Sequence, residues 1–143
     1  MKLKALIIDD EEFARKNLSL LLQEYCENVE IIGEASGKAS AKKLIQEKKP
    51  DVLFLDIRMP SGAEGFELLE ELDQQNLLVV FVTAFKDFAI KAFNANAIYY
   101  LLKPIDIDEL KLACDKLVES KLIFDQHPEN FETYYASLKN LSN

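Results

Sequence analysis

Cysteine and glycine are scarce in this sequence, and basic residues are outnumbered by acidic ones; each of these features argues against a class of protein. The two cysteines, Cys26 and Cys114, lie far apart and form neither a zinc-binding pattern nor a disulfide framework, so we expect both to be reduced packing residues. No glycine-rich loop follows the first hydrophobic run, which disfavours nucleotide binding. The net charge is −8, so we do not expect this chain to grip a nucleic-acid backbone by itself.

Long hydrophobic runs are also missing. No run reaches the length of a membrane span, and residues 1–4 lead into an apolar run that is too short for a signal peptide. By elimination we expect a cytoplasmic protein with no membrane contact. The 143 residues, of which 49% are hydrophobic and 29% charged, suffice for one domain with a buried core.

Short hydrophobic runs alternate with segments of helical periodicity. The runs predict five strands, at Leu3–Ile8, Val29–Ala35, Val52–Leu55, Leu77–Val82 and Ala97–Leu102. The segments between and after them predict five helices: one from Phe13, one around Ala41–Ile45, one at Phe66–Leu72 after a loop over Pro60–Gly65, one at Phe85–Phe93, and one capped by Asp106. This alternation is typical of a doubly wound α/β fold with a parallel sheet.

The last part of the chain has a different character. Residues 125–130, Asp-Gln-His-Pro-Glu-Asn, are polar and contain a proline, which predicts a linker or loop. Residues 129–143 have partly helical spacing, which is typical of a short extra helix or of the start of a further element not contained in this sequence. We therefore divide the chain into a domain at 1–122 and a C-terminal extension or linker at 123–143.

Polar side chains stand at the carboxyl ends of four predicted strands. They are Asp9 and Asp10 after the first strand, Asp56 after the third, Thr83 after the fourth and Lys103 after the fifth. In a parallel sheet of order 2-1-3-4-5 the ligand crevice lies between strands 1 and 3, which brings Asp9, Asp10 and Asp56 together. Because three close carboxylates repel one another, the simplest remedy is a hard cation such as Mg²⁺.

This set of side chains suits phosphoryl transfer. Asp56 is the candidate nucleophile, which would form an acyl phosphate. A metal and Lys103 would neutralise the transferring group, and Thr83 would hydrogen-bond an oxygen of the product. Each residue alone could instead have an ordinary structural role. Asp9 and Asp10 could cap the first helix, Thr83 could form a hydrogen bond within its own turn, and Lys103 could be a surface residue. Their joint placement at strand ends favours a site.

Five motifs extend this pattern along the chain. They are Ile-Ile-Asp9-Asp10-Glu-Glu, Leu-Phe-Leu-Asp56-Ile-Arg-Met-Pro60, Gly65-Phe-Glu-Leu-Leu, Val-Thr83-Ala84 and Leu-Leu-Lys103-Pro104. With them, residues 2–122 resemble the receiver domains of two-component response regulators. The resemblance implies a flavodoxin-like (CheY-like) fold with strand order 2-1-3-4-5. It also implies that a sensor histidine kinase donates a phosphoryl group to Asp56 in the presence of Mg²⁺.

The same resemblance assigns the metal ligands. It implies that Asp10 and Asp56 bind Mg²⁺ together with the backbone carbonyl of Arg58, and that Asp9 helps through water. It also implies a cis peptide bond at Lys103-Pro104. As a receiver domain, the chain would catalyse only its own phosphoryl transfer and slow autodephosphorylation.

We expect phosphorylation to act through a change of conformation at two switch residues. Thr83 and Tyr100 occupy the positions of the family's switch residues, and phosphorylation would shift the population toward a state in which Thr83 moves to the phosphoryl group and Tyr100 turns inward. The segment Thr83–Pro104 looks like the LytTR class. This implies a receiver part of a transcription regulator, with DNA contact only through an output domain outside this sequence. On phosphorylation we expect a homodimer through helix 4, strand 5 and helix 5.

Two other functions fit less well. An aspartate-nucleophile phosphohydrolase usually carries an Asp two residues after its nucleophile on strand 1, whereas Asp9 is followed by Glu11. A pseudo-receiver that acts only as a binding module would lack reacting groups, yet the expected groups are all present.

Overall fold

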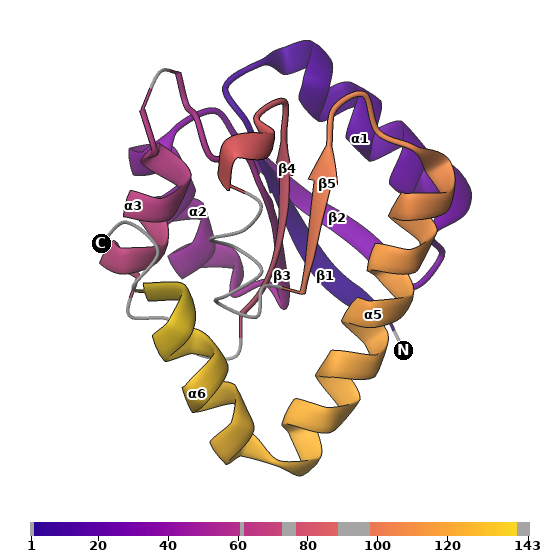
Figure 1. Ribbon diagram of the computed structural model, residues 1–143, viewed down its shortest axis with the longest axis vertical. Coiled ribbons are helices and arrows are strands. Elements are labelled where there is room, and N and C mark those ends of the chain that lie inside the picture. Colours follow the sequence, from indigo (N-terminus) through magenta and orange to yellow (C-terminus); the bar gives the residue numbers. More distant parts are fainter. Residues whose placement is uncertain (1, 61, 73–76, 89–97, 140–143) are drawn as a thin grey trace.

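The computed structural model describes residues 2–60, 62–72, 77–88 and 98–139. Five strands form one parallel sheet in the order β2-β1-β3-β4-β5 (Figure 1). The strands are β1 (Leu3–Ile8), β2 (Val29–Ala35), β3 (Val52–Leu55), β4 (Leu78–Thr83) and β5 (Tyr99–Leu102). The predicted fold class and strand order are therefore confirmed.

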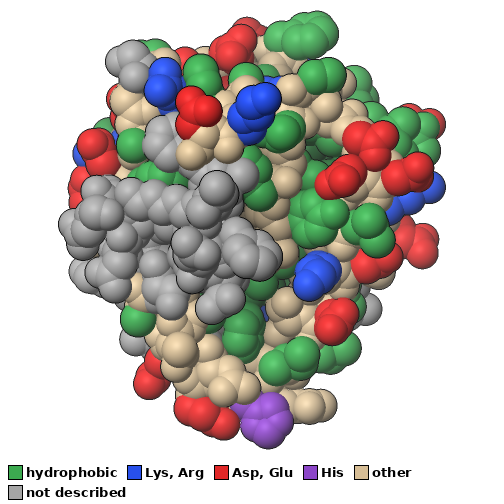
Figure 2. Space-filling view, viewed as in Figure 1, with side chains coloured by type: hydrophobic (Ala, Val, Ile, Leu, Met, Phe, Trp, Pro, Cys, Tyr) green, Lys and Arg blue, Asp and Glu red, His purple; other side chains and the backbone are tan. Residues whose placement is uncertain are grey.

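Helices cover both faces of this sheet. They are α1 (Glu12–Tyr25), α2 (Lys38–Lys48), α3 (Glu64–Glu71), α5 (Ile107–Gln126) and α6 (Pro128–Lys139), with a 3-10 turn η1 at Lys86–Phe88. Helices α1 and α5 lie on one face and α2 and α3 on the other (Figure 1). The surface carries more acidic than basic side chains in the view of Figure 2, in keeping with the net charge. In the described part of the chain no helix is long and apolar enough to cross a membrane.

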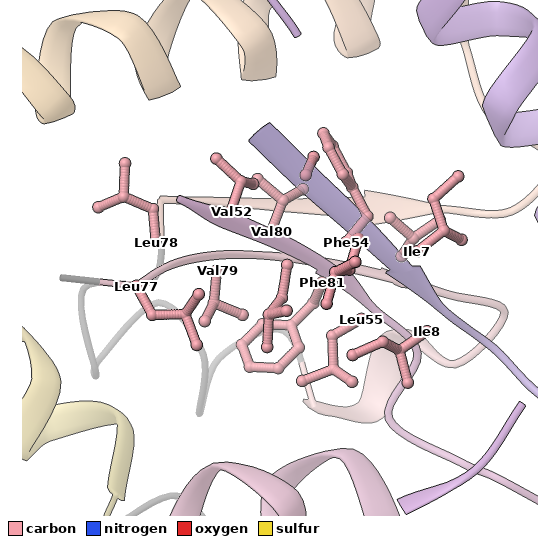
Figure 3. Packing of buried hydrophobic residues seen from close by; sticks show 14 of the residues in the cluster. Ile7, Ile8, Val52, Phe54, Leu55, Leu77, Leu78, Val79, Val80 and Phe81 are labelled. Carbon is pink, nitrogen blue, oxygen red and sulfur yellow. The ribbon is translucent and has the colours of Figure 1, made fainter. Parts of the chain in front are cut away.

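The central strands are buried on both faces because both layers of helices pack on them. All residues of β3 and β4 are buried. Their side chains alternate between the two faces: Phe54 and Val80 point to one side of the sheet, and Leu55 and Val79 to the other (Figure 3). This explains why β3 and β4 are continuous hydrophobic runs rather than alternating ones.

Local signals set several helix ends. The carboxylate of Asp106 accepts a hydrogen bond from the Glu109 amide at 3.1 Å, so the predicted N-cap of α5 is confirmed. Helix α2 ends at Lys48 and is followed by the C-cap residue Lys49, which adopts a left-handed conformation with φ 48°. The Lys103-Pro104 bond is cis, as the resemblance implied.

Some predicted boundaries were wrong. Strand β4 begins at Leu78 and includes Thr83, and β5 begins at Tyr99. The helix expected at Phe85–Phe93 is, within the described residues, only the turn η1, and the remainder of that prediction lies outside them.

Gly65, which was expected in a loop, lies in the first turn of α3. The reason is steric: a Cβ there would lie 2.3 Å from the backbone oxygen of Asp56. The Gly65 amide also donates to the Ile57 carbonyl at 2.7 Å, so α3 begins directly against the loop that follows β3.

The predicted linker at 125–130 is also wrong, because α5 continues to Gln126 and α6 begins at Pro128. Helix α6 packs on α3 and α5. It buries Tyr134, whose side chain lies 5.4 Å from the ring of Phe124 and whose hydroxyl accepts a hydrogen bond from the Val79 amide at 2.9 Å. Strand β5 pairs with β4 only from Val80 onward, so the Val79 amide lies just beyond that ladder.

Candidate functional site

The carboxyl ends of β1, β3, β4 and β5 bring the predicted site residues together. Asp9 and Asp56 directly follow β1 and β3, Thr83 ends β4, and Lys103 follows β5. Asp9, Asp56 and Thr83 are almost completely buried, with exposed fractions of 4%, 5% and 0%. Among the charged, Ser, Thr, Asn and Gln residues of the described chain, no others are so buried. Such burial is costly for carboxylates unless they have partners or a ligand.

Lys103 is one partner of the buried carboxylates. Its Nζ atom lies 2.6 Å from Asp9 Oδ2 and 3.2 Å from Asp56 Oδ2. Burial by itself lowers the pKa of Lys103, but the hydrogen bond to Asp9 and the charge of Asp56 outweigh burial and raise this pKa above its ordinary value. Lys103 is therefore held as a cation facing two carboxylates, as the sequence predicted for its position.

Asp56 remains incompletely satisfied. Burial raises the pKa of its carboxyl group, although the charge of Lys103 and the Thr83 hydroxyl act in the opposite direction. Its Oδ1 atom is buried and has no hydrogen bond of acceptable geometry within the described residues. A buried acceptor without a donor is destabilising by roughly 1–3 kcal/mol, so this oxygen is prepared for a ligand that is positively charged or electrophilic.

The three carboxylates can hold a metal ion. One oxygen from each of Asp9, Asp10 and Asp56 lies within 4.8 Å of the others, and Asp10 is the most exposed of the three. Hard oxygen donors in a partly open site suit Mg²⁺, which keeps several of its waters. The orphaned Asp56 oxygen and this donor set therefore fit the predicted ion. The fourth predicted ligand, the carbonyl of Arg58, belongs to the loop after β3 and stays a prediction.

Asp9 also has a role in the start of α1. Its Oδ1 accepts a hydrogen bond from the Glu11 amide at 3.0 Å, while its backbone carbonyl accepts one from Arg15 at 2.8 Å. The N-cap of α1 is Glu11, which makes no side-chain capping bond. The helix-capping alternative thus holds in part for Asp9, but its second oxygen still faces Lys103 in the site.

Phe85 connects the two predicted switch residues. Its amide donates to Thr83 Oγ1 at 3.4 Å, and its carbonyl accepts a hydrogen bond from the Tyr100 hydroxyl. The Tyr100 ring is tilted against Phe81, with centroids 6.1 Å apart. On the outer side, the Arg58 guanidinium carbon lies 4.2 Å from the centroid of the Phe85 ring. One residue of the loop after β4 therefore contacts both switch positions and the loop after β3.

Sequence reasoning missed Glu64. Its Oε1 accepts hydrogen bonds from the Met59 amide at 2.8 Å and the Gly62 amide at 2.9 Å, so it holds the loop that follows Asp56. The signal available was an acidic residue in the first turn of a helix, which is common and therefore weak.

The comparisons with known proteins agree with this geometry. The family model for the response regulator receiver domain matches residues 5–115, and the chain belongs to this family of signalling domains. It is similar to the transcriptional regulatory protein BtsR of Escherichia coli strain K12, with 44% identity over 131 residues that cover 90% of this chain and 54% of that protein. An uncharacterized response regulatory protein of Vibrio cholerae is 46% identical over 127 residues, which cover 88% of this chain and 53% of that protein.

A solved structure supports the same assignment. The response regulatory domain of mrkE from Klebsiella pneumoniae aligns with a TM-score of 0.73 and 31% identity, over 83% of this chain and 98% of that one. The chain spans about half the length of the curated relatives it matches.

Proposed function

We propose that Asp56 is the phosphoryl acceptor of this receiver domain and that a sensor histidine kinase is the donor. The observation that carries the proposal is the buried Oδ1 of Asp56, which lacks a hydrogen bond within the described residues while Lys103 and two further carboxylates surround the same side chain. A structural carboxylate would be expected to have both oxygens satisfied.

The chemistry follows from these surroundings. A carboxylate oxygen of Asp56 attacks the phosphorus of a phosphohistidine, the new P–O bond forms as the P–N bond breaks, and the imidazole nitrogen keeps the electron pair. Lys103 favours the ionised form of Asp56 and then balances charge on the phosphoryl oxygens. Thr83, at the end of β4, donates its hydroxyl hydrogen to one of those oxygens. Asp9, Asp10 and Asp56 would hold Mg²⁺, which would supply further positive charge near the same group.

The test is incubation with acetyl phosphate and Mg²⁺ followed by intact mass and peptide mapping. We expect one added phosphoryl group on Asp56, none in Asp56→Asn, and strong reduction when Mg²⁺ is chelated. Asp108→Asn, which alters an exposed carboxylate on α5, is the matched control and should accept the group normally. A phosphoryl group on another residue, or an unchanged yield in Asp56→Asn, would contradict the proposal.

We also propose that Thr83, Phe85 and Tyr100 form the switch. When Thr83 turns to a phosphoryl group, it no longer orients the Phe85 amide, and the bond between Tyr100 and the Phe85 carbonyl is exchanged for an inward position of the ring. The changed surface would include β5 and α5 and favour a homodimer. Light scattering after size exclusion, with and without beryllofluoride, should show a larger mass only when Mg²⁺ is present. An unchanged mass would count against a dimer, and Tyr100→Ala should weaken any dimer that forms.

The wider assignments rest on the relatives and on the resemblance. We propose that the chain is the receiver part of a cytoplasmic transcription regulator, since BtsR, of which the chain covers 54%, is named a transcriptional regulatory protein. The LytTR class, DNA contact through an output domain, slow autodephosphorylation and a domain boundary near residue 122 belong to the same proposal. The phosphohydrolase alternative is not favoured, because Glu11 is exposed and only its amide contacts Asp9.

A further inference from the structure

The Arg58 side chain stacks on the Phe85 ring and so joins the loop after β3 to the loop after β4. Its guanidinium carbon lies 4.2 Å from the ring centroid, well within the limit of about 6 Å for a cation–π interaction. We propose that this stack is a latch that stabilises the unphosphorylated conformation and opposes the switch. The latch rests on the proposed function, because it resists the movement that phosphorylation of Asp56 would cause.

The Arg58 end of the latch stands on a firmly held segment of backbone. On one side of Arg58, the Ile57 carbonyl accepts a hydrogen bond from the Gly65 amide at 2.7 Å. On the other side, the Met59 amide donates a hydrogen bond to Glu64 Oε1 at 2.8 Å. Both neighbours of Arg58 are buried. Because the start of α3 holds them, the Arg58 backbone has little freedom to follow a movement of the loop after β4.

The Phe85 end belongs to a loop that is anchored by side chains. The Phe85 amide donates to Thr83 Oγ1 over a long 3.4 Å, and the Phe85 carbonyl accepts the Tyr100 hydroxyl. The proposed switch would redirect both partners, Thr83 toward a phosphoryl group and Tyr100 inward. Of these three contacts of Phe85, the stack on Arg58 is the one that neither movement releases. It therefore resists the displacement of the loop.

The exposure of the stack determines how strongly it can act. Phe85 is 37% exposed, so water screens the interaction and the stack is weaker than a fully desolvated one. A cation–π interaction of this kind changes an equilibrium by roughly 2- to 5-fold. A ligand that binds only the switched conformation has an apparent affinity proportional to the population of that conformation. Loss of the latch should therefore tighten the binding of such a ligand by the same factor.

Isothermal titration calorimetry of the full chain with beryllofluoride and Mg²⁺ measures this effect. Phe85→Leu removes the ring face while Arg58 keeps its charge, and we expect this variant to bind beryllofluoride roughly 2- to 5-fold more tightly than the wild type. A ring that only supported the structure of the site would give the opposite sign, because its loss would loosen the site and weaken binding. Equal or weaker binding by Phe85→Leu would therefore overturn the latch.

Tyr25→Leu is the matched control. Tyr25 is 36% exposed, and the centroid of its ring lies 5.3 Å from Lys111 Nζ, so this variant also removes a cation–aromatic pair of similar exposure. Tyr25 is the last residue of α1, whereas the site lies at the start of that helix. Its loss should leave the affinity for beryllofluoride unchanged. A gain equal to that of Phe85→Leu would reveal a general effect of losing a surface ring and would overturn the latch.

Arg58→Lys tests the other end of the latch and keeps the positive charge near Asp56. A lysine ammonium lacks the planar face with which a guanidinium stacks on a ring. This variant should therefore bind beryllofluoride more tightly than the wild type but less tightly than Phe85→Leu. The double variant should bind no more tightly than Phe85→Leu alone, because the stack is already absent. No gain in Arg58→Lys, or additive gains in the double variant, would contradict the latch.

The same titrations separate failure of the latch from failure of the proposed function. No binding of beryllofluoride by the wild type, together with no phosphoryl group on Asp56 after acetyl phosphate, would overturn the proposed function and the latch with it. Binding by the wild type that is unchanged in Phe85→Leu and Arg58→Lys would overturn the latch alone. Circular dichroism of each variant establishes that the affinities compare folded proteins.

Discussion

Two buried polar side chains near opposite ends of the sheet have opposite surroundings. Asp56 follows the carboxyl end of β3, and its Oδ1 has no hydrogen bond within the described residues. Tyr134 reaches the first half of β4, where its hydroxyl accepts the Val79 amide. Both are 5% exposed, and burial raises the pKa of each. Burial alone therefore does not separate a reactive group from a structural one, whereas the presence or absence of a hydrogen-bond partner does.

The larger expected effect on stability concerns Tyr134. Tyr134→Phe keeps the ring but leaves the Val79 amide buried without an acceptor, and we expect a loss of about 1–3 kcal/mol in the free energy of unfolding. Urea denaturation measures it. The matched control is Tyr99→Phe, which removes a hydroxyl that donates to Glu109 at the surface and should change stability by less than about 0.5 kcal/mol. Equal losses of unfolding free energy in the two variants would contradict the structural role of the Tyr134 hydroxyl.

The smaller effect concerns Asp56 and has the opposite sign. Asp56→Asn removes a desolvated charge, so we expect the unfolding free energy in the absence of divalent cations to rise by about 1 kcal/mol while phosphorylation is lost. Asp108→Asn should leave both nearly unchanged. A variant less stable than the wild type at neutral pH would show that the Asp56 carboxylate is structurally satisfied.

The pH dependence sharpens the same prediction. Because the folded-state pKa of Asp56 is raised, the native protein binds this proton more tightly than the unfolded chain. The destabilisation by Asp56 is fully present above the folded-state pKa and fades as the pH falls toward the unfolded value. The advantage of Asp56→Asn should therefore shrink with decreasing pH and vanish near the ordinary pKa of an aspartate.

The sheet and the site were predictable for a common reason. Continuous hydrophobic runs such as Val52–Leu55 identify strands buried on both faces, and parallel strands place their last residues at one edge. Asp9, Asp56 and Lys103 could therefore be brought together without coordinates. The hydrogen bonds that set their charge states could not, because they depend on side-chain positions.

The features that were missed have specific physical causes. Pro128 suggested a break in the chain, but proline is well tolerated as the first residue of a helix, and it begins α6. Gly65 suggested a loop, although its small size serves the close approach of a helix to the backbone of Asp56.

On the α3 side, the pocket around the proposed acceptor Asp56 is bounded at Gly65 by main-chain atoms. There the α3 backbone bonds directly to the Ile57 carbonyl and leaves no room for a side chain. Main-chain atoms held in a helix have no rotamers to exchange, so this wall has little freedom to respond when the charge on Asp56 changes. The opposite wall is lined by the Thr83 hydroxyl and the Phe85 loop, which can rotate. We therefore expect the conformational change that follows phosphorylation to spread toward β4 and β5, and not toward α3.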